Sequence, residues 1–278
     1  MSIPASNENK NTIYLITGAN RGIGRCLTDL ILSRPNTTVV ALVRDLEHET
    51  TKSLVDTHAH AHESLNKLIV IPYDASVPGS ADEAISTLQS PSHKITHVDV
   101  VIANAGMLTK RGPAIDTPAE DILSSVRVNA IAPLDLFRAF FSSSSLMSPK
   151  PTKFIAISSA IGSTQLIPQH AHSSTLAYGL SKAALNHAMR KLSVEYPETI
   201  VEVLTPGPVM TDLMRENKDQ LEAMLKVNPK LMERFTPIEQ ACKGLLGWID
   251  SASKETSGGF RDWSGNRMPR QRKDTVLL

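Results

Sequence analysis

Two side chains in the second half of the chain have the types and spacing needed for proton transfer. Tyr178 and Lys182 lie four residues apart in the segment YGLSK, and residues four apart share one face of a helix. A phenol is protonated at neutral pH, so it can donate a proton to a carbonyl oxygen. A neighbouring ammonium favours the phenolate that remains. The pair therefore predicts general-acid catalysis; the alternative is an ordinary tyrosine–lysine pair on a helix.

A serine and an asparagine are candidates to complete this site. Ser159 follows the apolar run 154–158, and a hydroxyl at the end of a buried strand can bond to a substrate oxygen and stabilise developing charge. Ser158 is the alternative, because neighbouring residues of a strand point to opposite faces. Asn129 lies in a mostly apolar segment. A buried amide needs partners, so Asn129 is either a site residue or a core residue bonded to backbone.

A glycine-rich loop, TGANRGIG, follows the first apolar run, 13–16. Glycines at such a turn remove the Cβ atoms that would block a phosphate, and they let a helix begin close to the strand. The amide groups at the start of that helix then point toward a pyrophosphate. The alternative is a tight turn without a ligand. The predicted dinucleotide-binding residues of this loop are Gly18, Asn20, Arg21, Gly22, Ile23 and Gly24.

The residue at the end of the second apolar run indicates which dinucleotide is preferred. Arg44 lies twenty residues after Gly24, where a carboxylate would bind the ribose hydroxyls of NADH. A guanidinium instead pairs with the 2′-phosphate of NADPH, and Arg21 is a second cation for the same group. NADPH/NADP+ is therefore predicted over NADH, although Asp45 weakens the preference. The alternative is that both arginines are ordinary surface charges.

The elements that must position these residues are predicted strands and helices, which alternate along the chain. Nearly continuous runs of Ile, Val and Leu are typical of strands buried on both faces, and longer amphipathic segments separate them. The predicted strands are 12–17, 37–43, 67–73, 97–103, 152–158 and 200–204, and the predicted helices are 22–33, 47–62, 80–89, 119–144, 175–196 and 237–253. This order predicts an α/β fold of the Rossmann type, a doubly wound parallel sheet of about seven strands with helices on both faces. No linker divides the chain, so we expect a single domain over residues 1–278.

Composition excludes several other classes of protein. There are 29 Lys+Arg and 28 Asp+Glu, for a net charge of +1, which disfavours nucleic-acid binding. The two cysteines, Cys26 and Cys242, are too few for a disulfide framework or a zinc site. His58, His60 and His62 repeat every two residues and so do not share one helix face. We expect no metal site and a solvated helix there.

No segment approaches the roughly 20 consecutive apolar residues of a membrane-spanning helix. The N-terminal segment lacks the basic start and apolar core of a signal peptide. These features predict a cytoplasmic protein without a membrane partner.

Taken together, the motifs resemble the short-chain dehydrogenase/reductase family, over roughly residues 10–265. The loop TGANRGIG fits the family's TGxxxGxG, and YGLSK fits its YxxxK. The resemblance implies a catalytic tetrad of Asn129, Ser159, Tyr178 and Lys182, with Asn129 holding a water in a proton relay. Further cofactor-binding residues implied by it are Asp74 near the adenine, Asn104 in the NAG motif, Tyr178 and Lys182 at the nicotinamide ribose, and Val209 and Thr211 in the segment PGPVMT. Among family members, the loop and Arg44 resemble carbonyl reductases and fungal polyketide ketoreductases.

The resemblance implies NADPH-dependent reduction of a ketone or aldehyde, with Tyr178 as the acid. The alternatives are a non-redox enzyme on the same fold (a dehydratase, isomerase or cyclase) and a non-catalytic NADP-binding regulator. Nineteen positions separate Ser159 from Tyr178, more than is usual in the family. We expect the insertion 160–177, with Gln165, His170 and His172, to form part of the substrate rim.

Two further segments bear on the substrate and on assembly. Methionines among charged residues, from Met210 to Met232, are typical of adaptable apolar surfaces. In this family the segment at about 208–236 is a substrate lid, which implies an apolar or aromatic carbonyl substrate.

Apolar residues cover a wide arc of the predicted helix at 122–141, more than one core-facing stripe requires. It is either buried in the monomer or, as the family implies, packed in a homodimer or homotetramer.

Overall fold

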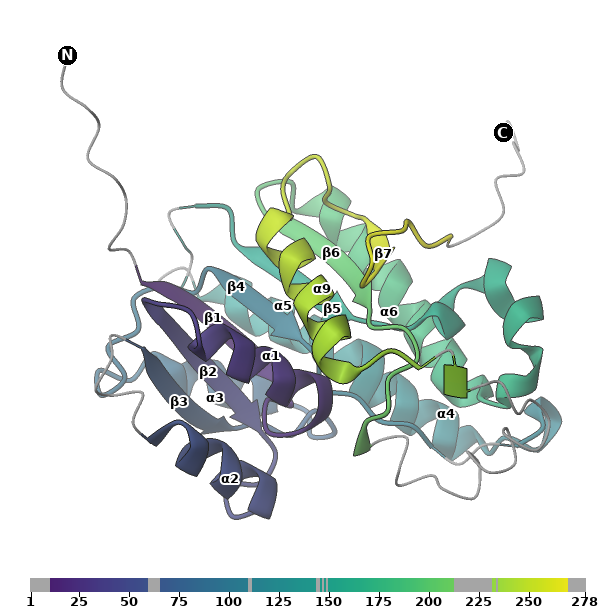
Figure 1. The fold of residues 1–278 in the computed structure, drawn as a ribbon, viewed down its shortest axis with the longest axis horizontal. Coiled ribbons are helices and arrows are strands. Elements are labelled where there is room, and N and C mark those ends of the chain that lie inside the picture. The colour runs from purple at the N-terminus through teal and green to yellow at the C-terminus, as the bar shows by residue number, and fades with distance from the viewer. Residues whose placement is uncertain are drawn as a thin grey trace.

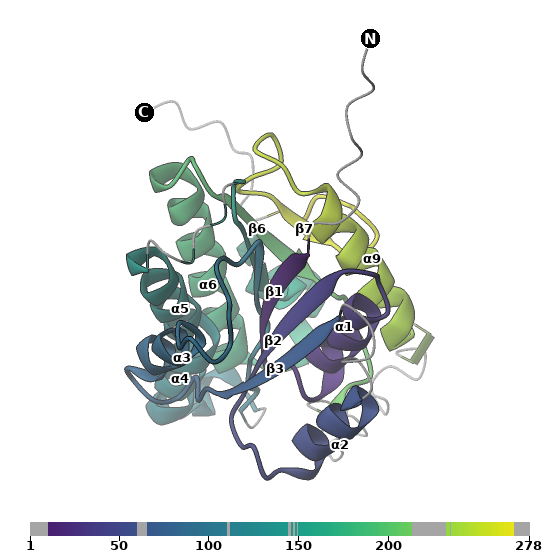
Figure 2. The ribbon, with the colours of Figure 1, turned by 90° about the vertical axis from the view of Figure 1, so that its left-hand side faces the viewer.

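A computed structural model describes residues 11–59, 66–109, 112–143, 146, 148, 150–212, 232–233 and 235–269. Seven parallel strands form one sheet in the order β3-β2-β1-β4-β5-β6-β7 (Figure 1). Viewed along the sheet, α3 to α6 cover one face, and α1 and α9 cover the other (Figure 2). The predicted doubly wound Rossmann fold is confirmed. None of the described helices is long and apolar enough to cross a membrane.

The strands are β1 (Thr12–Thr17), β2 (Thr37–Val43), β3 (Lys67–Pro72), β4 (Val100–Ala103), β5 (Lys153–Ile157), β6 (Ile200–Thr205) and β7 (Phe260–Asp262). β2 is buried along its whole length, as its unbroken β-branched run predicts. The predicted strand at 97–103 begins three residues late, because the Val98 amide donates to the carbonyl of Leu146, which lies in a 3-10 turn, and not to a strand of the sheet. β7 was not among the predicted strands, and its three residues are too short to show a periodic pattern.

The helices are α1 (Gly22–Leu32), α2 (Glu49–Thr57), α3 (Ser80–Leu88), α4 (Ala119–Val126), α5 (Ala132–Ser142), α6 (Leu176–Glu195) and α9 (Ile238–Ser251). The helix predicted at 119–144 is present from Ala119 to Ser142, but it is not α-helical throughout. A π-helical turn, η3 (Arg127–Ile131), separates α4 from α5, and the Ala132 amide bonds to the carbonyl of Arg127, five residues back. Pro133 has no amide hydrogen to continue the α-helical pattern, which is the physical reason for the interruption.

The predicted helix at 47–62 is also shorter than expected. His48 caps its start by accepting from the Thr50 amide, and His58 caps its end. His58 is not a solvated side chain: its Nε2 lies 2.7 Å from Asp29 of α1, and Arg25 binds the same carboxylate at 2.9 Å. The other two histidines of this tract, His60 and His62, lie outside the described residues. Within the described ranges, no three potential metal ligands form a group.

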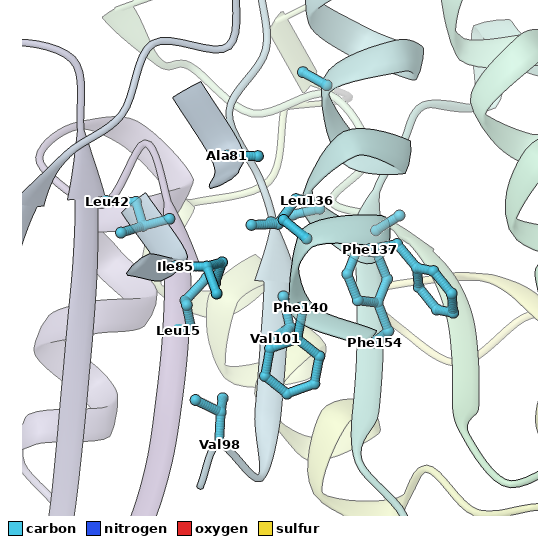
Figure 3. Close-up of a cluster of buried hydrophobic side chains, with 14 of the residues drawn as sticks. Leu15, Leu42, Ala81, Ile85, Val98, Val101, Leu136, Phe137, Phe140 and Phe154 are labelled. Carbon is cyan, nitrogen blue, oxygen red and sulfur yellow. The ribbon is translucent and has the colours of Figure 1, made fainter. Parts of the chain in front are cut away.

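The core has one hydrophobic cluster on each face of the sheet. In the cluster beneath α5, Leu15 and Leu42 of the sheet pack with Leu136 and Phe140 of the helix (Figure 3). Phe140 and Phe154 are fully buried. This packing fixes α5 and the strands relative to one another. The strand order reverses between β1 and β4, and ligands of such sheets bind at the carboxyl ends of the strands beside this reversal.

Candidate functional site

The glycine loop follows β1 at this edge of the sheet. Gly18 and Gly22 have φ angles of +63° and +55°, which only glycine adopts at little cost. A Cβ on Gly24 would lie 2.1 Å from the carbonyl oxygen of Gly18. The three glycines therefore allow the turn and bring α1 directly against the end of β1.

The start of α1 presents backbone amide groups to which no capping side chain bonds among the described residues. Arg21 is the capping residue, in an extended conformation, and its side chain makes no capping hydrogen bond. Its first turn, which starts at Gly22, also carries no acidic residue. Uncapped amides and the positive end of the helix dipole fit a bound pyrophosphate.

Two predicted cofactor-binding asparagines brace the loop. Asn104, just after β4, donates from Nδ2 to the carbonyl oxygens of Thr17 at 2.9 Å and Gly18 at 3.3 Å. The Thr17 hydroxyl in turn accepts from the Asn104 amide at 2.9 Å. Asn20 donates to the hydroxyls of Thr50 and Thr51 of α2 at 2.7 and 3.1 Å. Both side-chain amides thus hold the loop in place.

The predicted adenosine-binding residues lie at the ends of β2 and β3. Arg44 is exposed directly after β2, and no hydrogen bond or ion pair joins it to the residues that the structure describes. Asp74 follows β3 and accepts at Oδ1 from the Ser76 amide at 2.8 Å and the Ser76 hydroxyl at 2.7 Å. Its carboxylate is therefore fixed at the same edge of the sheet as the glycine loop.

The predicted proton-transfer pair, Tyr178 and Lys182, lies on the first turns of α6. Tyr178 is half-buried, and Lys182 is only 4% exposed. The Lys182 Nζ lies 5.7 Å from the centroid of the Tyr178 ring. The same Nζ donates to the carbonyl oxygen of Ile157, the last residue of β5, at 2.8 Å. The structure therefore places both groups together, as their spacing predicts.

Burial changes the acidity of Lys182. Removal from water penalises the ammonium and lowers the pKa of Lys182 to about 8. The ammonium is still the main form at neutral pH, where it favours a negative charge on the neighbouring phenol oxygen.

Of the two serines, Ser159 is the one available to a ligand. Ser158 is buried and donates to Oδ1 of Asn186 at 2.7 Å, so its hydroxyl serves the core. Ser159 is half-buried and begins η5 (Ala160–Gly162) by accepting from the Ile161 amide. A Cβ on Gly162 would lie 2.7 Å from the backbone of Lys182. The turn that follows Ser159 therefore packs directly on the part of α6 that carries Lys182.

Asn129 is fully buried in the π-helical turn. Its Oδ1 accepts from the Met107 amide at 2.8 Å, and its Nδ2 donates to the Met107 carbonyl at 2.9 Å. A Cβ on Gly106 would lie 3.1 Å from this Oδ1 and 3.8 Å from Lys182 Nζ. Asn129 thus lies close to the lysine end of the site, with its side chain bonded to backbone.

One partner of Asn129 was missed in the sequence. Its Nδ2 also donates to the hydroxyl of Ser181 at 2.9 Å. Ser181 directly precedes Lys182, and this position within YGLSK is the only sequence signal that could have identified it.

The segment after β6 returns to the glycine loop. The Cβ and methyl of Thr211 lie within 3.8 Å of the position of a Cβ on Gly22, and Val209 is buried and pairs with Thr236. Gly207 has a φ of +70° and packs on the indole of Trp263, a contact that no local sequence pattern predicts. Most of the predicted lid, residues 213–231 and 234, lies outside the described residues.

The insertion before Tyr178 forms η5 and a segment of 3-10 turns, η6 (Thr164–Ser173), which is kinked at His170. The Gly112 amide donates to the carbonyl of Ser174 at 3.0 Å, so the loop after β4 and the insertion meet. Gln165 is exposed and His170 is half-buried, whereas the side chain of His172 is outside the described part. The side chain of Ile167 is 58% exposed.

Comparisons with known proteins agree with this geometry. The family model for short chain dehydrogenase matches residues 12–222. The norsolorinic acid ketoreductase of Aspergillus parasiticus is 34% identical over 253 residues, which cover 90% of this chain and 87% of that protein. The short chain dehydrogenase gsfK of Penicillium aethiopicum is 35% identical over 91% of this chain and 97% of its own length.

Solved structures with the same fold include carbonyl reductases. The NADPH-bound carbonyl reductase from chicken fatty liver superposes with a TM-score of 0.77 at 26% identity, over 94% of this chain and 99% of that chain. The carbonyl reductase Sniffer of D. melanogaster superposes with a TM-score of 0.73 at 22% identity, over 94% of this chain and 100% of that chain. At this identity the similarity shows the fold alone. The chain belongs to the short-chain dehydrogenase/reductase family and is an oxidoreductase related to ketoreductases and carbonyl reductases.

Proposed function

We propose that the protein reduces a ketone or aldehyde to an alcohol with NADPH. The observation that carries this proposal is the position of Tyr178 and buried Lys182, 5.7 Å apart from ring to ammonium, beside the turn that begins at Ser159. A protonated phenol next to a buried ammonium is the arrangement that a carbonyl oxygen needs as it gains negative charge.

The described residues fit a nicotinamide dinucleotide. The uncapped start of α1 would hold the pyrophosphate, and Asp74 and Arg44 lie where the adenosine would reach the ends of β3 and β2. When bound, the reduced nicotinamide supplies a hydride to the carbonyl carbon. The side chains of Lys182 and Tyr178 would bond to the adjoining ribose.

Side chains of the protein then supply the proton to the carbonyl oxygen and replace it afterwards. The Tyr178 hydroxyl donates its proton to the carbonyl oxygen, and the Ser159 hydroxyl donates a hydrogen bond to the same atom. The Lys182 ammonium stabilises the phenolate that remains on Tyr178. Asn129 would hold the water through which the proton is replaced, with the second lone pair of Oδ1 as the acceptor, because both of its N–H groups are already used. General-acid catalysis of this kind contributes about 10²–10⁴-fold to a rate.

The preference for NADPH rests on Arg44. Its exposed side chain follows β2 directly, where a guanidinium can pair with a 2′-phosphate. The NADPH-bound carbonyl reductase with which the chain superposes supports the same choice.

The substrate class follows from the rim of the site and from the relatives. Ile167 and Leu166 make the insertion partly apolar, and two relatives are ketoreductases of norsolorinic acid. We therefore propose an apolar or aromatic carbonyl compound, and we expect the protein to act as a homo-oligomer.

The test is a panel of aromatic and aliphatic ketones and aldehydes, assayed for consumption of NADPH and of NADH separately. We expect NADPH consumption, with alcohol formed in equal amount, and faster turnover of aromatic than of small aliphatic ketones. Tight NADPH binding without consumption across the panel would favour a non-catalytic binding protein. Product formation without loss of NADPH absorbance would favour a non-redox enzyme.

A further inference from the structure

Ser181 forms the centre of a buried hydrogen-bonded bridge between two parts of the site. It is fully buried, as is Asn129. Its hydroxyl accepts from Asn129 Nδ2 at 2.9 Å and donates to the carbonyl oxygen of Tyr178 at 2.8 Å. The bridge joins the π-helical turn η3 to the turn of α6 that carries the proton donor.

The bridge uses the last hydrogen-bond donor of Asn129. An amide has two N–H groups, and Asn129 gives one to the Met107 carbonyl and the other to Ser181. Without the Ser181 hydroxyl, a fully buried N–H would have no partner, which is costly in a protein interior. The Asn129 side chain or the helix α6 would then have to move.

Such a movement would occur within the site. Ser181 lies between Tyr178 and Lys182 in sequence, and the Asn129 Oδ1 and Lys182 Nζ both lie within 3.8 Å of the position of a Cβ on Gly106. A displacement of about 1 Å in catalytic geometry can lower a rate about 10²-fold.

We propose that Ser181 is a positioning residue. Its hydroxyl fixes the position of the Asn129 side chain relative to the turn of α6 that carries Tyr178, and thereby supports proton transfer by Tyr178. This inference rests on the proposed function. It assigns to a serine outside the predicted tetrad the role of fixing the tetrad's geometry.

The test is a double-mutant cycle on the full-length enzyme, with Ser181→Ala, Asn129→Ala and the double variant. We expect Ser181→Ala to lower kcat by about 10- to 100-fold, while the Kd of NADPH changes less than about twofold. Because Ser181 acts through Asn129, the double variant should lose little more kcat than Asn129→Ala alone.

Thr37→Val is a matched control for loss of a buried hydroxyl. Thr37 is 3% exposed and bonds to the Ile31 carbonyl at the start of β2, away from the site. We expect it to lower the melting temperature without lowering kcat. If Ser181→Ala does not fold, Ser181→Cys replaces the hydroxyl with a weak hydrogen-bonding thiol of similar size and should also lose kcat.

Two results would overturn the inference while leaving the proposed function intact. One is a Ser181→Ala enzyme whose kcat stays within about twofold of the wild type. The other is a double variant whose losses in kcat multiply, as independent sites would. A wild-type enzyme that reduces no carbonyl compound would instead overturn the proposed function, and this inference with it.

Discussion

At the scale of single residues, the burial of Lys182 sets the pKa of the ammonium that is proposed to take part in the reaction. Its ammonium is buried against the end of β5 and donates to the Ile157 carbonyl. Burial lowers the pKa of Lys182 to about 8, so the side chain loses its charge within the experimental pH range. The same group is proposed to stabilise the Tyr178 phenolate, which makes the reaction sensitive to this titration.

The titration of Lys182 gives a pH prediction. Because the ammonium is the useful form, kcat/KM for NADPH should be constant below about pH 7.5 and fall as the pH rises through about 8. This parameter reports groups of the free enzyme, which is the state described here.

The same titration changes the free energy of unfolding in the opposite direction. The unfolded state binds the extra proton between about 8 and 10.5, so this group's contribution to the free energy of unfolding rises with pH in that window. A kcat/KM profile that stays flat above pH 9 would contradict the role of the ammonium.

Arg44 carries the prediction about the cofactor. Arg44→Asp removes the cation proposed to bind the 2′-phosphate and adds a repelling carboxylate. We expect the Kd of NADPH to rise about 10- to 100-fold, as for loss of a charge-assisted hydrogen bond, while the Kd of NADH changes much less. Fluorescence titration measures both. Lys191→Asp, at the far end of α6, is the control for a change in net charge. Equal weakening of both dinucleotides by Arg44→Asp would contradict the assignment.

At the scale of elements, the site depends on how closely η5 approaches α6. A Cβ on Gly162 would lie 2.7 Å from the Lys182 carbonyl carbon and 2.9 Å from the Ala183 amide nitrogen. These are backbone atoms in the middle of a helix, so they cannot move aside without moving the lysine. Glycine at this position therefore sets the distance between Ser159 and the catalytic turn.

Gly162→Ala should therefore affect both stability and activity. We expect the free energy of unfolding to fall by about 1–3 kcal/mol, as for overpacking of a core, and kcat to fall by more than about tenfold. Denaturant titration and steady-state assays measure the two effects. Gly247→Ala is the matched control, because nothing lies within 4 Å of a Cβ there and Gly247 is within α9. It should leave kcat unchanged and add about 0.5–1 kcal/mol of stability. Normal activity in Gly162→Ala would contradict the proposed close packing.

Sequence patterns predicted the elements well where the signal is local. The β-branched run of β2, the glycine loop and the four-residue spacing of Tyr178 and Lys182 are each contained within a few residues. The π-helical turn η3 was not predicted, because the apolar pattern continues through it. Pro133, which follows this turn, is the local signal that could have indicated it. β7 is three residues long and too short for a periodic signal.

The contacts within the site were harder to predict than the elements. Ser181 and Asn129 are 52 residues apart in the chain, and Asn20 and Thr50 are 30 apart. Such pairs meet only because the sheet order brings their elements together, and nothing in the residues nearby indicates the partner. This is why the tetrad stays a prediction that rests on the resemblance, while the contact between Ser181 and Asn129 could not be predicted at all.

At the scale of the whole molecule, apolar side chains remain exposed over α4 and α6. Leu123 is 69% exposed and Val194 is 63% exposed, and the two helices lie on the same face of the sheet (Figure 2). Contiguous exposed apolar patches mark interaction surfaces, whereas single exposed apolar residues are common on any protein surface. The homo-oligomer therefore stays a prediction, and on it this face would pack on a second copy.

Light scattering coupled to chromatography tests the assembly. We expect the wild type to have at least twice the chain mass of 30.2 kDa, and Leu123→Lys to shift the mass toward that of one chain, because a buried unpaired charge is costly. Val55→Lys is the control, since Val55 of α2 is 44% exposed but lies away from α4 and α6. A monomeric wild type would contradict the assembly and leave the site unaffected.

The measurement that tests the central claim most directly is the Tyr178→Phe variant, assayed with the best carbonyl substrate of the wild type. The change removes one oxygen atom and keeps the ring, so the fold and the glycine loop should be preserved. We expect the rate of NADPH oxidation to fall by about 10²–10⁴-fold, while the Kd of NADPH changes less than about threefold. A variant that keeps more than about a tenth of the wild-type rate would show that the Tyr178 hydroxyl is not the proton donor.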